Sequence, residues 1–121
     1  MNTIKQTNLE TIEISIVVPV YNEKENLVLL DQEITKSIKP LNKSYEVILV
    51  DDGSMDGSSE LIRTLQEKNS TIRLIRFGHN HGQTAAFAAG FDKARGDIIV
   101  TMDADLQNSP SDIPLLLAAI K

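Results

Sequence analysis

Residues 47–57 read VILVDDGSMDG, in which four apolar residues are followed at once by two carboxylates, a glycine and a serine. A short run of β-branched and apolar side chains that stops at charged residues is typical of a buried strand ending in a loop. Three similar runs occupy residues 14–18, 72–75 and 98–100. Two of the four runs are almost continuously apolar, which indicates a parallel sheet with both faces covered.

A helical pattern separates the first two of these runs. Its apolar residues recur at spacings of three and four, which places them on one face of a helix: Leu27, Leu30, Ile34 and Ile38. Asn22 followed by Glu25 predicts a capping box at the start of this helix. We therefore expect the helix to begin directly after Asn22.

Three more helices are predicted further along the chain. One spans Leu61–Leu65 and has Asp56 or Ser58 as its cap, and a second covers residues 85–94, where alanines and a glycine allow close packing on the sheet. A third covers residues 112–121. Strand and helix thus alternate four times, which predicts βαβ units and a three-layer α/β fold with a mostly parallel sheet.

The bulk properties are those of one globular domain. The chain has 121 residues, of which 41% are hydrophobic and 24% charged. We expect residues 1–13 to be a flexible tail and residues 14–121 to form the domain. Its net charge of -5 gives no basic patch for nucleic acid, and the absence of cysteine excludes disulfides and thiolate metal sites. No signal-peptide layout and no apolar run of about 20 residues are present, so we expect a cytoplasmic protein.

Polar residues follow all four predicted strands. The sequences at these positions are PVYNE (19–23), DDGS (51–54), GHNHGQ (78–83) and DADLQ (103–107). The carboxyl ends of parallel strands meet at one edge of a sheet, where α/β proteins bind their ligands. These residues are therefore the candidates for a functional site.

Asp103 and Asp105 are the first candidates for a ligand site. Two carboxylates at this spacing can turn toward one hard cation, and Mg²⁺ or Mn²⁺ prefers oxygen ligands while sharing phosphate oxygens with a substrate. The alternative is a turn in which Asp103 accepts local hydrogen bonds and Asp105 is solvated.

Asp51 and Asp52 have three possible roles: a nucleoside site, the acidic pocket of a phospho-receiver domain, or an ordinary turn. A receiver needs this strand near its N-terminus, but a complete strand–helix unit precedes it here. Tyr21 and Glu23 fit a stacking ring and a ribose-binding carboxylate, or a packing residue and a helix-dipole partner. His79 and His81 fit loop-bracing residues better than metal ligands, since no further ligands can be placed.

Taken together, these motifs resemble glycosyltransferase family 2. The resemblance covers residues 14–121. The motifs that carry it are IVVPVYNE (16–23), VDDGS-x-DG (50–57), Asn80-x-Gly82, AG-x-x-x-A-x-GD (89–97) and DAD (103–105). DADLQ (103–107) followed by Pro110 is most similar to the polyprenyl-phosphate branch, which includes dolichyl-phosphate mannose synthases and bactoprenol glucosyltransferases. The resemblance implies the N-terminal half of a GT-A-like, nucleotide-diphospho-sugar transferase fold.

The resemblance also implies roles for individual residues. Pro19, Tyr21 and Glu23 would line the nucleoside pocket, and Asp52 would contact the base or ribose while Asp51 supports the loop. Asp103 and Asp105 would be the catalytic metal and diphosphate ligands, and Gln107 would join the metal shell. Because Asp52 is expected to serve the ligand, its replacement should leave the fold intact.

The implied reaction is transfer, with inversion, of a hexose from a UDP- or GDP-linked donor to a lipid phosphate at the cytoplasmic face of a membrane, with Mg²⁺ or Mn²⁺ as cofactor. Family members continue well beyond 121 residues, so we expect this chain to hold the donor without transferring the sugar by itself. The apolar residues of 113–120 predict possible self-association. The alternative is a nucleotide-sugar-binding module without catalysis.

Overall fold

The computed structural model describes residues 11–105 and 110–120. Four strands form one sheet: β1 (Ile14–Val20), β2 (Tyr45–Asp51), β3 (Ile72–Arg76) and β4 (Ile98–Thr101). Their order is β3-β2-β1-β4, and every neighbouring pair is parallel. The predicted parallel sheet is confirmed, and each strand extends beyond the apolar run that predicted it.

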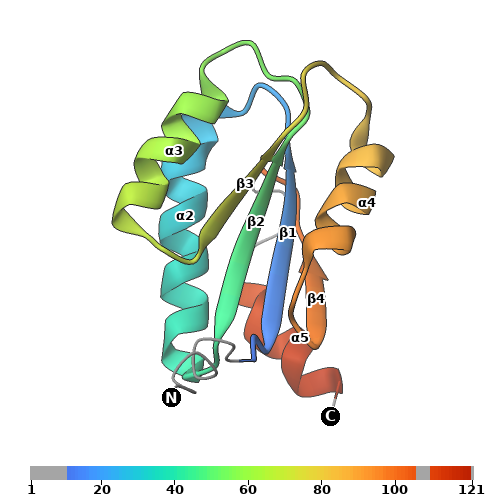
Figure 1. The fold of residues 1–121 in the computed structure, drawn as a ribbon. Helices are drawn as coiled ribbons and strands as arrows, with labels where there is room; N and C mark the ends of the chain where they lie inside the picture. Colours follow the sequence, from blue (N-terminus) through green and yellow to red (C-terminus); the bar gives the residue numbers. More distant parts are fainter. Residues whose placement is uncertain (1–10, 106–109, 121) are drawn as a thin grey trace, which may run out of the picture.

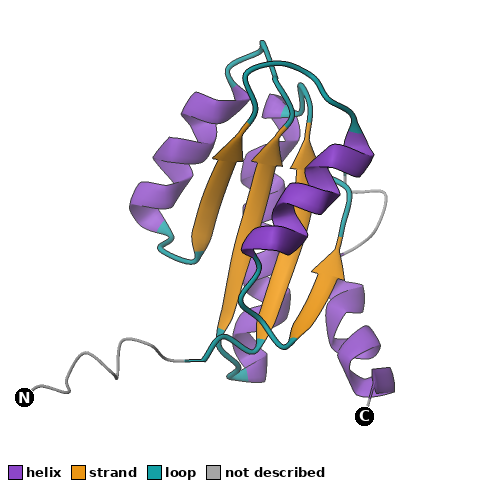
Figure 2. Cartoon of the chain, turned by 45° about the vertical axis from the view of Figure 1, so that its right-hand side comes forward, coloured by secondary structure: helices purple, strands orange, loops and turns teal. Residues whose placement is uncertain are grey.

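Helices cover both faces of the sheet (Figures 1 and 2). They are α2 (Lys24–Ile38), α3 (Ser58–Lys68), α4 (Gln83–Lys93) and α5 (Ile113–Ile120), with short 3-10 turns at Lys39–Leu41 and Pro110–Asp112. In the figures α2, α3 and α5 lie on one face and α4 lies on the other. The three-layer α/β fold is therefore confirmed.

The side chains of the central strands alternate between two cores, as the period of a strand requires. Ile16 and Val18 of β1 and Leu49 of β2 belong to the core beneath α2, α3 and α5. Val17 and Ile48 belong to the smaller core beneath α4. Burial on both faces explains why these strands read as continuous apolar runs.

Helix α4 approaches the sheet closely because of its small residues. Ala86 and Gly90 are its buried positions. A Cβ atom placed on Gly90 would lie 2.3 Å from Val17 Cγ1, a distance that real Cβ atoms do not show. The predicted packing role of the alanine-rich segment is confirmed at these two residues.

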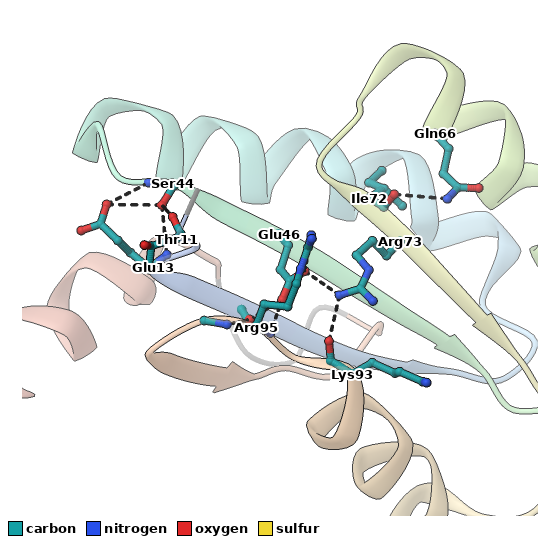
Figure 3. A network of polar contacts seen from close by, with 11 residues as sticks. Thr11, Glu13, Ser44, Glu46, Gln66, Ile72, Arg73, Lys93 and Arg95 are labelled. Carbon is teal, nitrogen blue, oxygen red and sulfur yellow. Dashed lines mark hydrogen bonds and ion pairs between the residues drawn. The ribbon is translucent and has the colours of Figure 1, made fainter. Parts of the chain in front are cut away.

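A buried carboxylate fastens the connection between α4 and β4 to the sheet (Figure 3). Glu46 of β2 is 1% exposed and receives hydrogen bonds from Ser15 Oγ (2.6 Å), Arg73 Nη1 (2.7 Å) and the Arg95 amide (2.7 Å). Burial raises the pKa of Glu46, but the hydrogen bonds from Ser15, Arg95 and Arg73 outweigh it and lower the pKa from 4.5 to about 2. Glu46 is therefore ionised, and it links β1, β2, β3 and the residues after α4.

The predicted capping box at Asn22 is wrong. Helix α2 begins at Lys24, and the preceding Glu23 makes no side-chain capping bond. Asn22 has a φ of 52°, a left-handed conformation, and its Oδ1 accepts a hydrogen bond from the Met55 amide at 2.8 Å. The side chain is thus committed to the neighbouring loop and does not reach the helix.

Asp56 supplies the cap that was expected from Asn22. Its Oδ2 accepts from the Lys24 amide of α2 at 3.1 Å, and its Oδ1 accepts from the Ser58 amide of α3 at 3.0 Å. Burial raises the pKa of Asp56, but the hydrogen bonds from Ser58 and Lys24 lower it overall. One carboxylate therefore accepts from the first amide of two helices. The N-cap of α3 is Gly57, which lies between the two predicted candidates, so neither Asp56 nor Ser58 is itself the N-cap.

Most of the predicted N-terminal tail lies outside the described residues. Within its last part, the Thr11 carbonyl accepts from Ser44 Oγ at 2.9 Å and Glu13 Oε1 accepts from the Ser44 amide at 3.0 Å. None of the helices in the described ranges is both long and apolar enough to cross a membrane.

Candidate donor-binding site

A cavity of about 360 Å³ opens at the carboxyl ends of the strands. The chain proceeds from β1 outward to β2 and β3 and then returns to β4 on the other side of β1, so the crevice between β1 and β4 is a topological switch point. The residues that line the cavity come from the ends of all four strands: Pro19, Val20, Tyr21, Glu23, Asp52, Asn80, Gly82, Gln83, Asp103, Ala104 and Asp105.

The end of β1 contributes Pro19, and the loop after it contributes Tyr21 and Glu23. Tyr21 is 48% exposed, so much of its ring faces solvent. This loop is bonded to the loop after β2, because the Asn22 amide donates to Ser54 Oγ at 2.8 Å. Tyr21 and Glu23 therefore line the cavity, whereas Asn22 between them bonds to the loop after β2.

Asp52 lines the cavity but also organises the loop after β3. It is 3% exposed, and its carboxylate accepts from the His81 amide (2.6 Å), the Gly82 amide (3.0 Å) and Asn80 Nδ2 (3.0 Å). A Cβ on the adjacent Gly53, whose φ is 78°, would lie 2.4 Å from the His79 carbonyl carbon. The sequence-based expectation that Asp52 serves the ligand more than the fold does not account for these bonds.

Asp51 is turned away from the cavity. It is 1% exposed, its Oδ1 accepts from the Ser54 amide at 2.9 Å, and its Oδ2 accepts from Ser59 Oγ. It is not among the residues that line the cavity. The geometry gives Asp51 the loop-supporting role that the family resemblance implied, and it shows no nucleotide contact surface at this carboxylate.

Asp103 and Asp105 lie on the β4 side of the cavity, where Asp103 is half-buried and Asp105 is exposed. Gln107, the third predicted ligand, lies outside the described residues. Within residues 11–105 and 110–120, no cluster of three or more His, Cys, Asp or Glu side chains could hold a metal ion by itself. Two carboxylates fit Mg²⁺ or Mn²⁺, because these ions commonly take one or two protein carboxylates and fill the other positions with water and phosphate oxygens.

The electrostatics of the cavity support the same fit. Four carboxylates line it, and no described lining residue is Lys or Arg: the carboxylates are Glu23, Asp52, Asp103 and Asp105. These carboxylates would repel an anionic ligand such as a diphosphate. A bound divalent cation would reverse that repulsion, because it is the largest local charge in such a site.

Several lining residues were not predicted as site residues, namely Val20, Asn80, Gly82, Gln83 and Ala104. Asn80 and Gly82 belong to a motif that carried the family resemblance, so their spacing was the available signal. His79 and His81 are not among the lining residues. Their rings are 4.2 Å apart and His81 packs edge-on against Phe77, which agrees with the loop-bracing interpretation.

Comparison with known protein families identifies the chain. The family described as glycosyl transferase family 2 matches residues 15–121. The chain belongs to glycosyltransferase family 2. The match covers the described strands and helices except for Ile14, the first residue of β1, and it includes the six predicted residues that line the cavity.

Curated proteins that are similar to this chain include two sugar transferases. The chain is 48% identical over 107 residues to the undecaprenyl-phosphate 4-deoxy-4-formamido-L-arabinose transferases of Aeromonas hydrophila subsp. hydrophila and of Salmonella choleraesuis. The aligned region is 88% of this chain and 33% of each relative. The chain thus spans about a third of the length of the curated relatives it matches.

Solved structures with a similar fold include a mannosyltransferase and S. aureus TarS. A mannosyltransferase of Pyrobaculum calidifontis, PcManGT, in complex with GDP-Man and Mn²⁺, has a TM-score of 0.71 and 27% identity over 80% of this chain and 28% of its own. S. aureus TarS, residues 1–349, in complex with UDP-GlcNAc has a TM-score of 0.75 and 22% identity over 89% of this chain and 30% of its own. The second likeness concerns the fold alone.

Proposed function

We propose that this chain is the donor-binding part of a glycosyltransferase that moves a sugar from a nucleoside diphosphate to a polyprenyl phosphate at the cytoplasmic face of a membrane. The observation that carries the proposal is the cavity between β1 and β4. It has an aromatic ring and a carboxylate on one side and two metal-compatible carboxylates on the other, and the described lining residues include no basic side chain.

The two sides of the cavity fit the two ends of the donor. Tyr21 offers an exposed ring face for a base, and Glu23 offers a carboxylate for ribose hydroxyls. Asp103 and Asp105 would hold Mg²⁺ or Mn²⁺, which when bound neutralises negative charge on the leaving diphosphate. The Mn²⁺ in the PcManGT complex supports a divalent cation in this fold.

The proposed chemistry is a direct displacement at the anomeric carbon. A phosphate oxygen of the lipid forms the new bond to this carbon while its bond to the diphosphate oxygen breaks, so the configuration inverts. The acceptor is already an anion, and no side chain has to remove a proton from it. The work of this chain is therefore to hold the donor in one orientation and to balance its charge.

The relatives' names bear on the sugar and the acceptor. They name undecaprenyl phosphate and 4-deoxy-4-formamido-L-arabinose, which is a pentose derivative. We therefore propose undecaprenyl phosphate as acceptor and favour a formamido-pentose over the hexose expected from the family resemblance. Donors linked to UDP and to GDP are both tested, because the described cavity residues do not indicate which base is bound.

The test is a transfer assay with the full-length protein. Radiolabelled UDP- and GDP-linked sugars, including the formamido-arabinose donor, are incubated with undecaprenyl phosphate and Mn²⁺, and label in the organic phase is counted. We expect transfer that stops when EDTA removes the metal. Donor binding without transfer would assign the protein to the alternative, a non-catalytic sugar-nucleotide module, and absence of donor binding would refute the proposal.

A further inference from the structure

Gln83 occupies an unusual place in the cavity. It is the first residue of α4, it lines the cavity, and its Nε2 donates to Asp103 Oδ1 at 3.2 Å. Sequence analysis placed it only among the polar residues that follow the third strand. The contact joins the α4 side of the cavity to one of the two carboxylates that fit a metal.

The position of Gln83 depends on a carboxylate from the loop after β2. Asp52, which follows β2, accepts hydrogen bonds from the amides of His81 and Gly82, the two residues before Gln83. Gly82 is the N-cap of α4 and has a φ of 98°, so the helix starts from a constrained turn. A chain of contacts therefore runs from Asp52 through the start of α4 to Gln83 and Asp103.

We propose that Gln83 is a positioning residue of the donor site, which orients Asp103 for a divalent cation; this rests on the proposed function. The amide holds one carboxylate oxygen of Asp103 and so limits the rotamers that this side chain samples before the cation binds. Less side-chain entropy is then lost on binding. Hydrogen bonds that orient metal ligands in this way typically change metal affinity by about 10- to 100-fold.

The exposure of Gln83 limits the size of the effect. Its side chain is exposed, so water can replace part of the hydrogen bond when the amide is removed. We therefore expect a loss of roughly tenfold in Mn²⁺ affinity, at the low end of the range for such partners. For the same reason, replacement of Gln83 should leave thermal stability close to that of the wild type.

The experiment measures Mn²⁺ binding by electron paramagnetic resonance in the full-length protein saturated with UDP or GDP, whichever the wild type binds. Gln83→Leu removes the donor at similar size, and Thr84→Ala changes the next, exposed residue, which does not line the cavity. We expect about tenfold weaker Mn²⁺ binding in Gln83→Leu and wild-type binding in Thr84→Ala. Melting temperatures are measured in parallel to confirm folding.

A second arm separates positioning of Asp103 from other roles of Gln83. In an Asp103→Ala background, Gln83→Leu should cause no further loss of nucleotide affinity at high Mn²⁺, because the oriented carboxylate is gone. An equal further loss in that background would overturn the inference, as would wild-type Mn²⁺ affinity in Gln83→Leu. If the wild type shows no metal-dependent nucleotide binding at all, the proposed function itself has failed.

Discussion

The adjacent carboxylates of Asp51 and Asp52 make different contacts at the end of β2. Asp51 and Asp52 are consecutive and both buried, but Asp51 accepts from Ser54 of its own loop and from Ser59 of α3, while Asp52 bonds to the loop after β3 and lines the cavity. The sequence predicted that this pair matters. The residue pattern by itself left the two roles open, and only the family resemblance gave Asp51 to the loop and Asp52 to the ligand. The roles depend on which way each side chain leaves the end of β2 and on contacts 29 residues away.

Asp52→Ala tests how much the Asp52 carboxylate contributes to the stability of the fold. Its carboxylate accepts three hydrogen bonds from Asn80, His81 and Gly82, and their loss leaves donors that only water can satisfy. We expect a loss of about 2 kcal/mol in the free energy of unfolding, seen as a melting temperature several degrees lower without ligand. The exposed Asp92→Ala is the control. An unchanged melting temperature in Asp52→Ala would mean that the carboxylate serves only the ligand.

At the scale of elements, the pattern of apolar residues was sufficient for the strands and helices but not for their ends. The buried face of α2 contains the four residues at helical spacing that predicted it. The start of α2 was wrong because a capping box presumes an extended residue at the cap, whereas Asn22 is left-handed and bonded to Met55. Local spacing does not contain that long-range contact.

Gly90→Ala tests how closely α4 packs on the sheet. The new methyl group would meet Val17 Cγ1 at 2.3 Å, and overpacking of this kind costs about 1–3 kcal/mol. Alanine also favours a helix by about 1 kcal/mol, so we expect a net loss of about 1 kcal/mol in urea unfolding. Gly78→Ala, which would meet no atom within 4 Å, is the control. A stabilised Gly90→Ala variant would contradict the close packing of α4 on β1.

For the molecule as a whole, the polar network around Glu46 joins segments that are far apart in the sequence. Ser15, Glu46, Arg73 and Arg95 come from β1, β2, β3 and the connection before β4. Ser15, Glu46 and Arg73 lie outside the motifs of the family resemblance, and Arg95 fills an unspecified position of one of them, so the sequence pattern does not single these residues out. The network bonds the segment just before β4 to the sheet, and β4 is the strand that leads to Asp103 and Asp105.

The network predicts a specific dependence of stability on pH. The pKa of Glu46 is about 2 in the folded protein against 4.5 ordinarily, so its contribution is complete above pH 4.5 and is lost as the pH falls toward 2. This shift corresponds to a contribution on the order of 3 kcal/mol. Glu46→Gln should be less stable than the wild type at pH 7, and the difference should shrink between pH 5 and pH 2. Exposed Glu60→Gln is the control, and a difference that does not vary with pH would contradict the ionised network.

The proposed function requires that Asp103 and Asp105 hold a cation, which allows an anion to enter an acidic cavity. Calorimetric titration of UDP and GDP into the wild type and Asp105→Ala, each with and without Mn²⁺, tests it directly. We predict that Mn²⁺ strengthens binding of at least one nucleotide to the wild type and that Asp105→Ala abolishes this gain. Equal nucleotide affinity in all four conditions would contradict a metal-dependent donor site at the carboxyl ends of β1 and β4.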